Sequence, residues 1–258
     1  MELYIIKIEN NSMVHKLTCK FLWVIFFTCF FCSCKDYESV YEEGRIKLNL
    51  SYYGAAIKDF DKCIKLDDQK ELAFHSRGLA YYYLHNLKQA EKDFLTALLL
   101  DPSCSDLHYN YGCLLYDQKK DELAKDYLSK ALSLNNDPLH GHITNKLAWI
   151  AYRTDLSNDD ALQYFDNSIE NNKYDAEAYF GKAYILYNKL NLTMYQQQIF
   201  SYLNTAITLN HKYAEAYYYR ALVHLNTNQR DSAVSDLKKS VKYGYNQAQT
   251  KINELGLK

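Results

Sequence analysis

The sequence predicts an all-α protein, an α-solenoid of about six stacked helix-turn-helix repeats closed by a C-terminal capping helix. Three observations predict this fold class. A 34-residue unit recurs along the chain. Only 2 Pro and 8 Gly occur in 258 residues, too few for a chain of short strands and tight turns. The 26 Tyr form an excess that repeated helix faces can accommodate.

The clearest copy of the unit runs from Glu71 to Cys104. Its first half places a bulky, a small and a bulky residue on one helical face, and its second half a small, a bulky and a small one. These positions are Phe74, Gly78, Tyr81, Ala90, Phe94 and Ala97. Asn86 marks the turn between the halves. Such a helix pair buries its apolar faces only against stacked copies of itself.

This pattern of aromatic and small residues, ending at Asp101-Pro102, resembles the tetratricopeptide repeat (TPR) family. The resemblance implies helix-turn-helix repeats and recognition of other proteins. Its register places six repeats at 37–70, 71–104, 105–138, 141–175, 176–213 and 214–247, and a capping helix and tail at 248–258. Repeat four has one extra residue, expected in its loop. Repeat five has four, expected between its helices before a second helix that starts at Thr193.

The N-terminus carries a short apolar segment, Phe21–Ser33, thirteen residues without a charge and preceded by Lys16 and Lys20. It is shorter than the roughly 20 residues of a membrane-spanning helix, and its form is that of a signal peptide. Ser33-Cys34 then resembles a bacterial lipoprotein signal, in which Cys34 becomes the lipidated first residue. An uncleaved signal anchor and a cleaved signal without lipid are the alternatives. Met13 is a possible true start, and 34–36 would be the lipidated Cys and a short linker.

Composition and motifs argue against nucleic-acid binding, cofactors and catalysis. Removing residues 1–33 takes away three Lys and two Glu and leaves 27 basic against 29 acidic residues, a net charge of −2. That charge gives no basic footprint for nucleic acid. No phosphate-binding glycine loop and no nucleophile motif is present. The close pair His140 and His142 lacks a third metal ligand. Cys63 takes the place of Ala97, so we expect a small core residue there, and nothing pairs Cys104 with Cys113.

The family resemblance also implies where a partner would bind. In TPR proteins the first helix of each repeat lines a concave groove. The matching residues here are mostly aromatic: Tyr41, His75, Tyr82, Tyr83, Tyr109, Tyr116, Trp149, Tyr152, Phe180, Tyr184, Tyr187 and Tyr218. Tyrosine offers a stiff contact surface and a hydroxyl that can bond to a peptide backbone. The alternative interpretation is that these rings pack helix against helix.

Together these features predict a non-enzymatic scaffold with no cofactor and no metal. It would be an exported lipoprotein, anchored in a bacterial outer membrane or on its periplasmic face, and would bind a protein or extended peptide in its aromatic groove. A signal-anchored membrane protein is the alternative for location. The alternative for function is a carbohydrate-binding or enzyme-accessory protein that uses the same groove.

Overall fold

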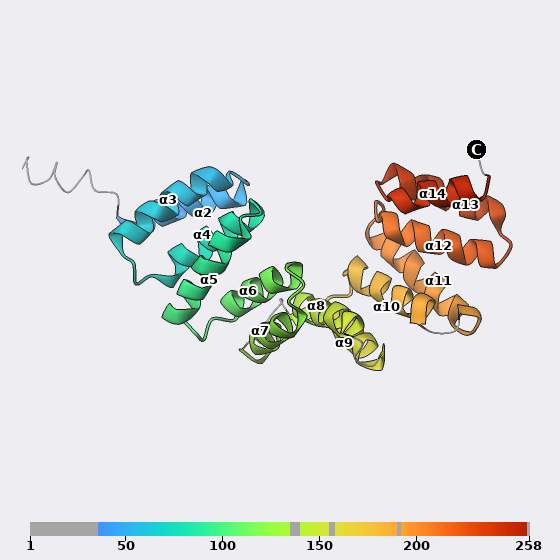
Figure 1. Cartoon of the computed structure of the whole chain (residues 1–258), viewed down its shortest axis with the longest axis horizontal. Helices are drawn as coiled ribbons and strands as arrows, with labels where there is room; N and C mark the ends of the chain where they lie inside the picture. Colours follow the sequence, from blue (N-terminus) through green and yellow to red (C-terminus); the bar gives the residue numbers. More distant parts are fainter. Residues whose placement is uncertain (1–35, 135–139, 155–157, 190–191, 257–258) are drawn as a thin grey trace, which may run out of the picture. The chain divides into compact units, whose positions relative to one another are not determined.

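The computed structural model describes residues 36–134, 140–154, 158–189 and 192–256. Within these ranges the chain forms thirteen α-helices and no strand, which confirms the predicted all-α fold class (Figure 1). Across the same ranges, no helix is both long enough and apolar enough to cross a membrane. The predicted signal peptide and Cys34 lie outside the described residues.

The chain divides into two compact units between Leu100 and Asp101. In the first unit each helix is followed by a partner packed against it, giving two helix pairs (Figure 1). They are α2 (Tyr37–Asn49) with α3 (Tyr53–Leu66), and α4 (Glu71–Tyr83) with α5 (Leu87–Leu100).

The second unit continues the same alternation of paired helices. Its elements are α6 (Ser105–Asp117), α7 (Asp121–Leu134), α8 (His140–Arg153), α9 (Asn158–Asn171), α10 (Ala176–Lys189), α11 (Leu192–Leu209), α12 (Ala214–Asn226), α13 (Arg230–Lys242) and α14 (Asn246–Glu254). Helix α14 buries Ala248 and Ile252 in a cluster with residues of α12 and α13. It therefore covers the apolar face that the last helix pair would otherwise expose.

The core of each pair lies where a small residue of the first helix meets a large one of the second. Phe60 and Phe94 are fully buried, and they fill the space above Gly44 and Gly78. Cys63 is also fully buried, which confirms the expectation of a small core residue. Burial raises the pKa of its thiol to about 11, so the thiol is protonated and unreactive at neutral pH.

The turn between the two helices of a repeat has one recurring geometry. Ser51, His85, Lys119 and Asn228 have φ between 57° and 63°, the left-handed region. The next residue donates its N–H to the carbonyl five residues back, as from Asn86 to Tyr81 at 2.9 Å. This bond is the helix-ending Schellman pattern, here completed by residues other than glycine. The predicted turn at Asn86 is confirmed, and the left-handed residue is its neighbour.

The four extra residues of repeat five do not lengthen a loop, as the sequence had led us to expect. Helix α11 begins at Leu192, so Thr193 lies inside the helix rather than capping it. The helix has 18 residues, whereas α3, α5, α7 and α9 have 14 each and α13 has 13. Four residues make about one helical turn, so the insertion keeps the apolar face of the helix in register.

Substituting glycines tests why a glycine is needed at these positions: because two helices approach closely there, or because the backbone needs freedom. A Cβ on Gly78 would lie 2.8 Å from two ring carbons of Phe94, whereas a Cβ on Gly54 would meet nothing within 4 Å. We expect Gly78→Ala to lower the free energy of unfolding by about 1–3 kcal/mol through overpacking. Gly54→Ala, also on a helix, should leave it unchanged or raise it by up to ~1 kcal/mol. Urea unfolding followed by circular dichroism measures both, and equal effects would contradict this account.

Candidate functional site

Half-buried aromatic rings gather on the first helices of the repeats in the second unit. Trp149 and Tyr152 lie on α8, and Tyr184 and Tyr187 on α10. Each pair is three residues apart, so both rings of a pair emerge from the same helical face. Tyr218 and Tyr219 of α12, and Tyr245 directly before α14, complete the group. We call the aromatic surface the set Trp149, Tyr152, Tyr184, Tyr187, Tyr218, Tyr219 and Tyr245.

Ring-to-ring contacts connect the helices across this surface. The ring of Tyr184 lies edge-on to Trp149 and Tyr152, with centroids 5.7 and 5.4 Å apart. It also contacts Tyr219 on α12 at 5.1 Å, and Tyr187 contacts Tyr219 at 5.3 Å. The chain of contacts continues from Tyr219 through Tyr218 to Tyr245. Edge-to-face geometry is favourable for aromatic pairs and fixes each ring against its neighbours.

Phe180 belongs to the layer beneath the aromatic surface rather than to the surface itself. Its side chain is only 6% exposed and lies in a buried cluster with Leu186 and Leu203. Its ring contacts Tyr213 at 4.9 Å and Tyr219 at 5.8 Å. Phe180 therefore supports the exposed rings and is left out of the surface proposed below.

Polar groups at the same place are occupied by the fold. The indole Nε1 of Trp149 donates to Glu177 Oε1 at 3.0 Å. The amide Nδ2 of Asn145 donates to Asp175 Oδ2 at 2.8 Å. The other oxygen of Asp175 accepts the backbone N–H groups of Glu177 and Ala178 and so caps α10. These bonds tie α8 to the start of α10.

Tyr116 lies at the α6 end of the second unit, among cations. Its ring has the guanidinium of Arg153 at 4.0 Å and the ammonium of Lys146 at 4.7 Å from its centre. Arg153 is also paired with Asp121 of α7. Tyr109 is a half-buried residue of α6 that hydrogen-bonds to Cys113, whose pKa burial raises to about 11.

The predicted groove residues of the first unit are more dispersed. Tyr41 is committed to packing, because its ring contacts Phe60 at 5.8 Å and its hydroxyl lies 3.1 Å from Ser76 Oγ. The ring of His75 meets Phe94 at 6.1 Å. Tyr82 and Tyr83 contact each other, and Tyr83 is 50% exposed. The aromatic surface of the second unit is therefore the stronger candidate site.

Sequence reasoning missed Tyr219 and Tyr245, which connect Tyr187 to Tyr218 and extend the surface beyond α12. One signal was available for Tyr219. Tyr217, Tyr218 and Tyr219 are consecutive, and a helix can bury only part of such a run. Tyr217 is the core member at 6% exposed, so its neighbours must point elsewhere. Tyr245 follows Gly244 and precedes the capping helix, where the family pattern assigns no groove position.

Several phenols of the surface are held in the neutral form by burial. Burial, followed by a hydrogen bond with Tyr184, raises the pKa of Tyr152 to about 12. Burial likewise raises the pKa of Tyr219 and of Tyr187. The hydroxyls of Tyr152, Tyr187 and Tyr219 can therefore donate or accept hydrogen bonds. Among the described residues, no group of three His, Cys, Asp or Glu side chains could hold a metal ion.

Comparisons with known proteins identify the repeats. Models of the tetratricopeptide repeat match residues 37–70 and 75–138, so this part of the chain consists of TPR repeats. The human mitochondrial import receptor subunit TOM70 is 27% identical over 143 residues. Those residues are 52% of this chain and 23% of TOM70, so the chain spans less than a quarter of that relative.

Solved structures extend the same fold over most of the chain. The Pseudomonas aeruginosa protein PilF superposes with a TM-score of 0.73 at 18% identity, covering 83% of this chain and 97% of PilF. YrrB, described as a TPR protein with an unusual peptide-binding site, gives 0.54 at 22% identity and covers 72% of this chain and 92% of YrrB. The described part of this chain therefore has a TPR solenoid fold.

The raised pKa of Tyr152 predicts a loss of stability in alkali. The folded state favours the protonated phenol, so its stabilisation is complete below pH 10, the ordinary pKa, and is lost as pH rises toward about 12. We expect the free energy of unfolding to fall over this interval, and Tyr152→Phe to reduce the slope. Urea unfolding at a series of pH values measures it. The control is Tyr174→Phe, since Tyr174 is 70% exposed. Equal slopes in both variants would contradict the assignment.

Proposed function

We propose that the protein is a non-enzymatic interaction scaffold whose aromatic surface binds an extended segment of a partner protein. The observation that carries this proposal is the chain of ring contacts across α8, α10, α12 and Tyr245. Large aromatic side chains that are held in place before binding are typical of interaction hot spots. TOM70, a relative in sequence, is named as an import receptor subunit, which supports a role in protein recognition.

A carbohydrate stacked on the same rings is less well supported. Sugar recognition there would need amides and carboxylates beside the rings, and Asn145 of α8 and Glu177 of α10 are two candidates. Both are already bonded within the fold, Asn145 to Asp175 and Glu177 to Trp149. The rings also present edges to one another, which leaves little flat surface for a sugar. The protein ligand is therefore the better assignment for the aromatic surface.

A photo-crosslinking amino acid at position 187 would test the surface directly. We expect it to form one discrete adduct with a partner protein, and mass spectrometry of the adduct identifies the contacted peptide. The synthetic peptide should bind the wild-type protein, and Tyr187→Ala with Tyr218→Ala should weaken it at least about tenfold, the scale of aromatic hot spots.

Tyr174 provides the matched control for this experiment, because it is an exposed tyrosine outside the aromatic surface. A crosslinker at position 174 should give no adduct, and Tyr174→Ala should bind the peptide as the wild type does. Adducts of equal yield at positions 174 and 187, or an unchanged affinity in the double variant, would overturn the proposed site. Circular dichroism confirms that each variant keeps its helices.

We further propose that the chain is exported and anchored to a membrane by a lipid on Cys34. The apolar run Phe21–Ser33, the lysines before it and the small residue before Cys34 support this proposal. Helix α2 begins at Tyr37, only three residues after Cys34. A lipid at that residue would hold the first repeat close to the membrane.

Expression in a bacterial host tests the anchor. We expect the mature chain to begin at Cys34 with a diacylglyceryl group, seen by intact mass, and to partition with membranes. Cys34→Ser should abolish the modification, whereas Cys32→Ser, two residues earlier, should not. An intact Phe21–Ser33 segment would support the signal-anchor alternative, and a cleaved chain without lipid would support an ordinary signal peptide.

A further inference from the structure

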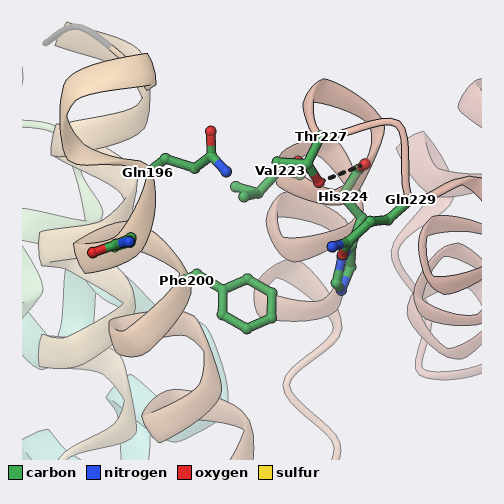
Figure 2. A pocket seen from close by; sticks show the side chains of 7 residues that line it. Gln196, Phe200, Val223, His224, Thr227 and Gln229 are labelled. Atoms are coloured by element: carbon green, nitrogen blue, oxygen red, sulfur yellow. Dashed lines mark hydrogen bonds between the residues drawn. The ribbon is translucent and has the colours of Figure 1, made fainter.

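A separate pocket opens between α11 and α12, and the proposed function does not use it. It has a volume of about 240 Å³. Gln196, Gln197 and Phe200 of α11 form one wall, and the opposite wall is Val223, His224, Thr227 and Gln229. Figure 2 shows Gln196 and Phe200 directed from α11 toward the α12 side of the pocket. The volume is roughly eight times the ~30 Å³ that one water molecule occupies in the liquid, so the pocket suits a single small ring.

The side-chain amides of the α11 wall are available to a ligand. In the part of the chain that the structure describes, neither Gln196 nor Gln197 uses its side chain in a hydrogen bond. Both lie in the second turn of α11, so their backbone N–H groups belong to the helix ladder and only the side chains can recognise a ligand. Each amide offers a donor group and an acceptor oxygen.

The opposite wall is held in one arrangement by His224, which is 9% exposed. Its Nδ1 donates to Gln229 Oε1 at 2.6 Å, which leaves the amide NH₂ of Gln229 as a donor. The hydroxyl of Thr227 donates to the carbonyl of His224 at 3.0 Å, so its oxygen remains an acceptor. The imidazole lies edge-on to Phe200, with ring centroids 5.1 Å apart. The pocket thus combines an aromatic wall with a ring of neutral donors and acceptors.

His224 is the one ionisable residue that lines this pocket, and its Nε2 lies 3.7 Å from Asp236 Oδ2. The nearest ion pair is closed on itself, because Arg220 binds both oxygens of Asp236 at 2.7 and 2.8 Å. Each of these groups already has a partner within the fold, so a charged ligand would find no unpaired counter-charge. A ligand with an apolar face for Phe200 and several hydroxyls for the amides would satisfy every group described. From this chemistry we infer that the pocket binds an uncharged sugar ring.

A second depression continues from the pocket past the same two rings. It measures about 520 Å³ and shares Phe200 and His224 with the first. The rest of its lining is the ion pair of Arg220 with Asp236, together with Asp231, Ser232, Ser235 and Lys239 of α13. A glycan could place its terminal sugar among the glutamines and its next sugar in this depression. The inference therefore includes a preference for a disaccharide over a monosaccharide.

Saturation-transfer NMR tests this on the mature protein, with glucose, galactose, mannose, N-acetylglucosamine and their disaccharides as probes. We expect saturable binding of at least one neutral disaccharide, tighter than that of its monosaccharide, and no competition from glucuronate. Gln196→Ala with Gln197→Ala should weaken binding at least about fivefold, consistent with the loss of neutral hydrogen bonds. Alanine preserves the helix.

Gln198 is the matched control, because it follows the two lining glutamines on the same helix and is exposed outside the pocket. Gln198→Ala should leave sugar binding unchanged. The inference is overturned if no neutral sugar binds, if the double variant binds as the wild type does, or if Gln198→Ala weakens binding equally. It is also overturned if Tyr187→Ala, on the aromatic surface, is the change that abolishes sugar binding.

Discussion

The fold depends on one close contact inside each helix pair, a small residue on the first helix against a large side chain on the second. A Cβ on Gly44 would lie 2.7 Å from Phe60 Cε1, and a Cβ on Gly112 would lie 2.8 Å from Leu128 Cγ. The helices can approach this closely only because the small residue leaves space for the large one. That approach buries the apolar stripe of the second helix. The opposite face of the first helix is left for half-buried rings such as those of the aromatic surface.

Beside this contact, a second pair of positions sixteen residues apart varies in chemistry without changing the geometry. Arg77 binds Asp93 through two nitrogens, and Arg220 binds Asp236 in the same way. The corresponding pair of α6 and α7 is Tyr111 with Tyr127, whose rings lie edge-on at 4.6 Å. Asp93 is 2% exposed, so its carboxylate requires the guanidinium. The two tyrosine rings carry no charge and need no counter-charge, so an aromatic pair can take the place of an ionic pair here.

Periodicity in the sequence was enough to predict the fold, because the small and large core positions recur at helical spacing. It identified Phe94 and Cys63 as core residues, and both are fully buried. It could not separate exposed from buried rings on the first helices. Phe180 and Tyr184 are four residues apart on one face, yet only Phe180 is enclosed, by Tyr213 and Tyr219 from farther along the chain. The sequence could not locate the four-residue insertion, because a full added turn keeps the helix in register and changes no periodic signal.

The aromatic surface and the pocket beside α12 differ in which of their groups the fold has already used. On the aromatic surface, Glu177 and the Nδ2 of Asn145 are used in joining α8 to α10, and the half-buried rings are what a partner can contact. Because those rings are already held by contacts with their neighbours, they would lose little further side-chain freedom when a segment binds. In the pocket the rings of Phe200 and His224 are fixed against each other, and the glutamine amides are what remains. One solenoid thus offers an apolar contact surface at one place and neutral hydrogen-bonding groups at another, which is why we assign them different ligands.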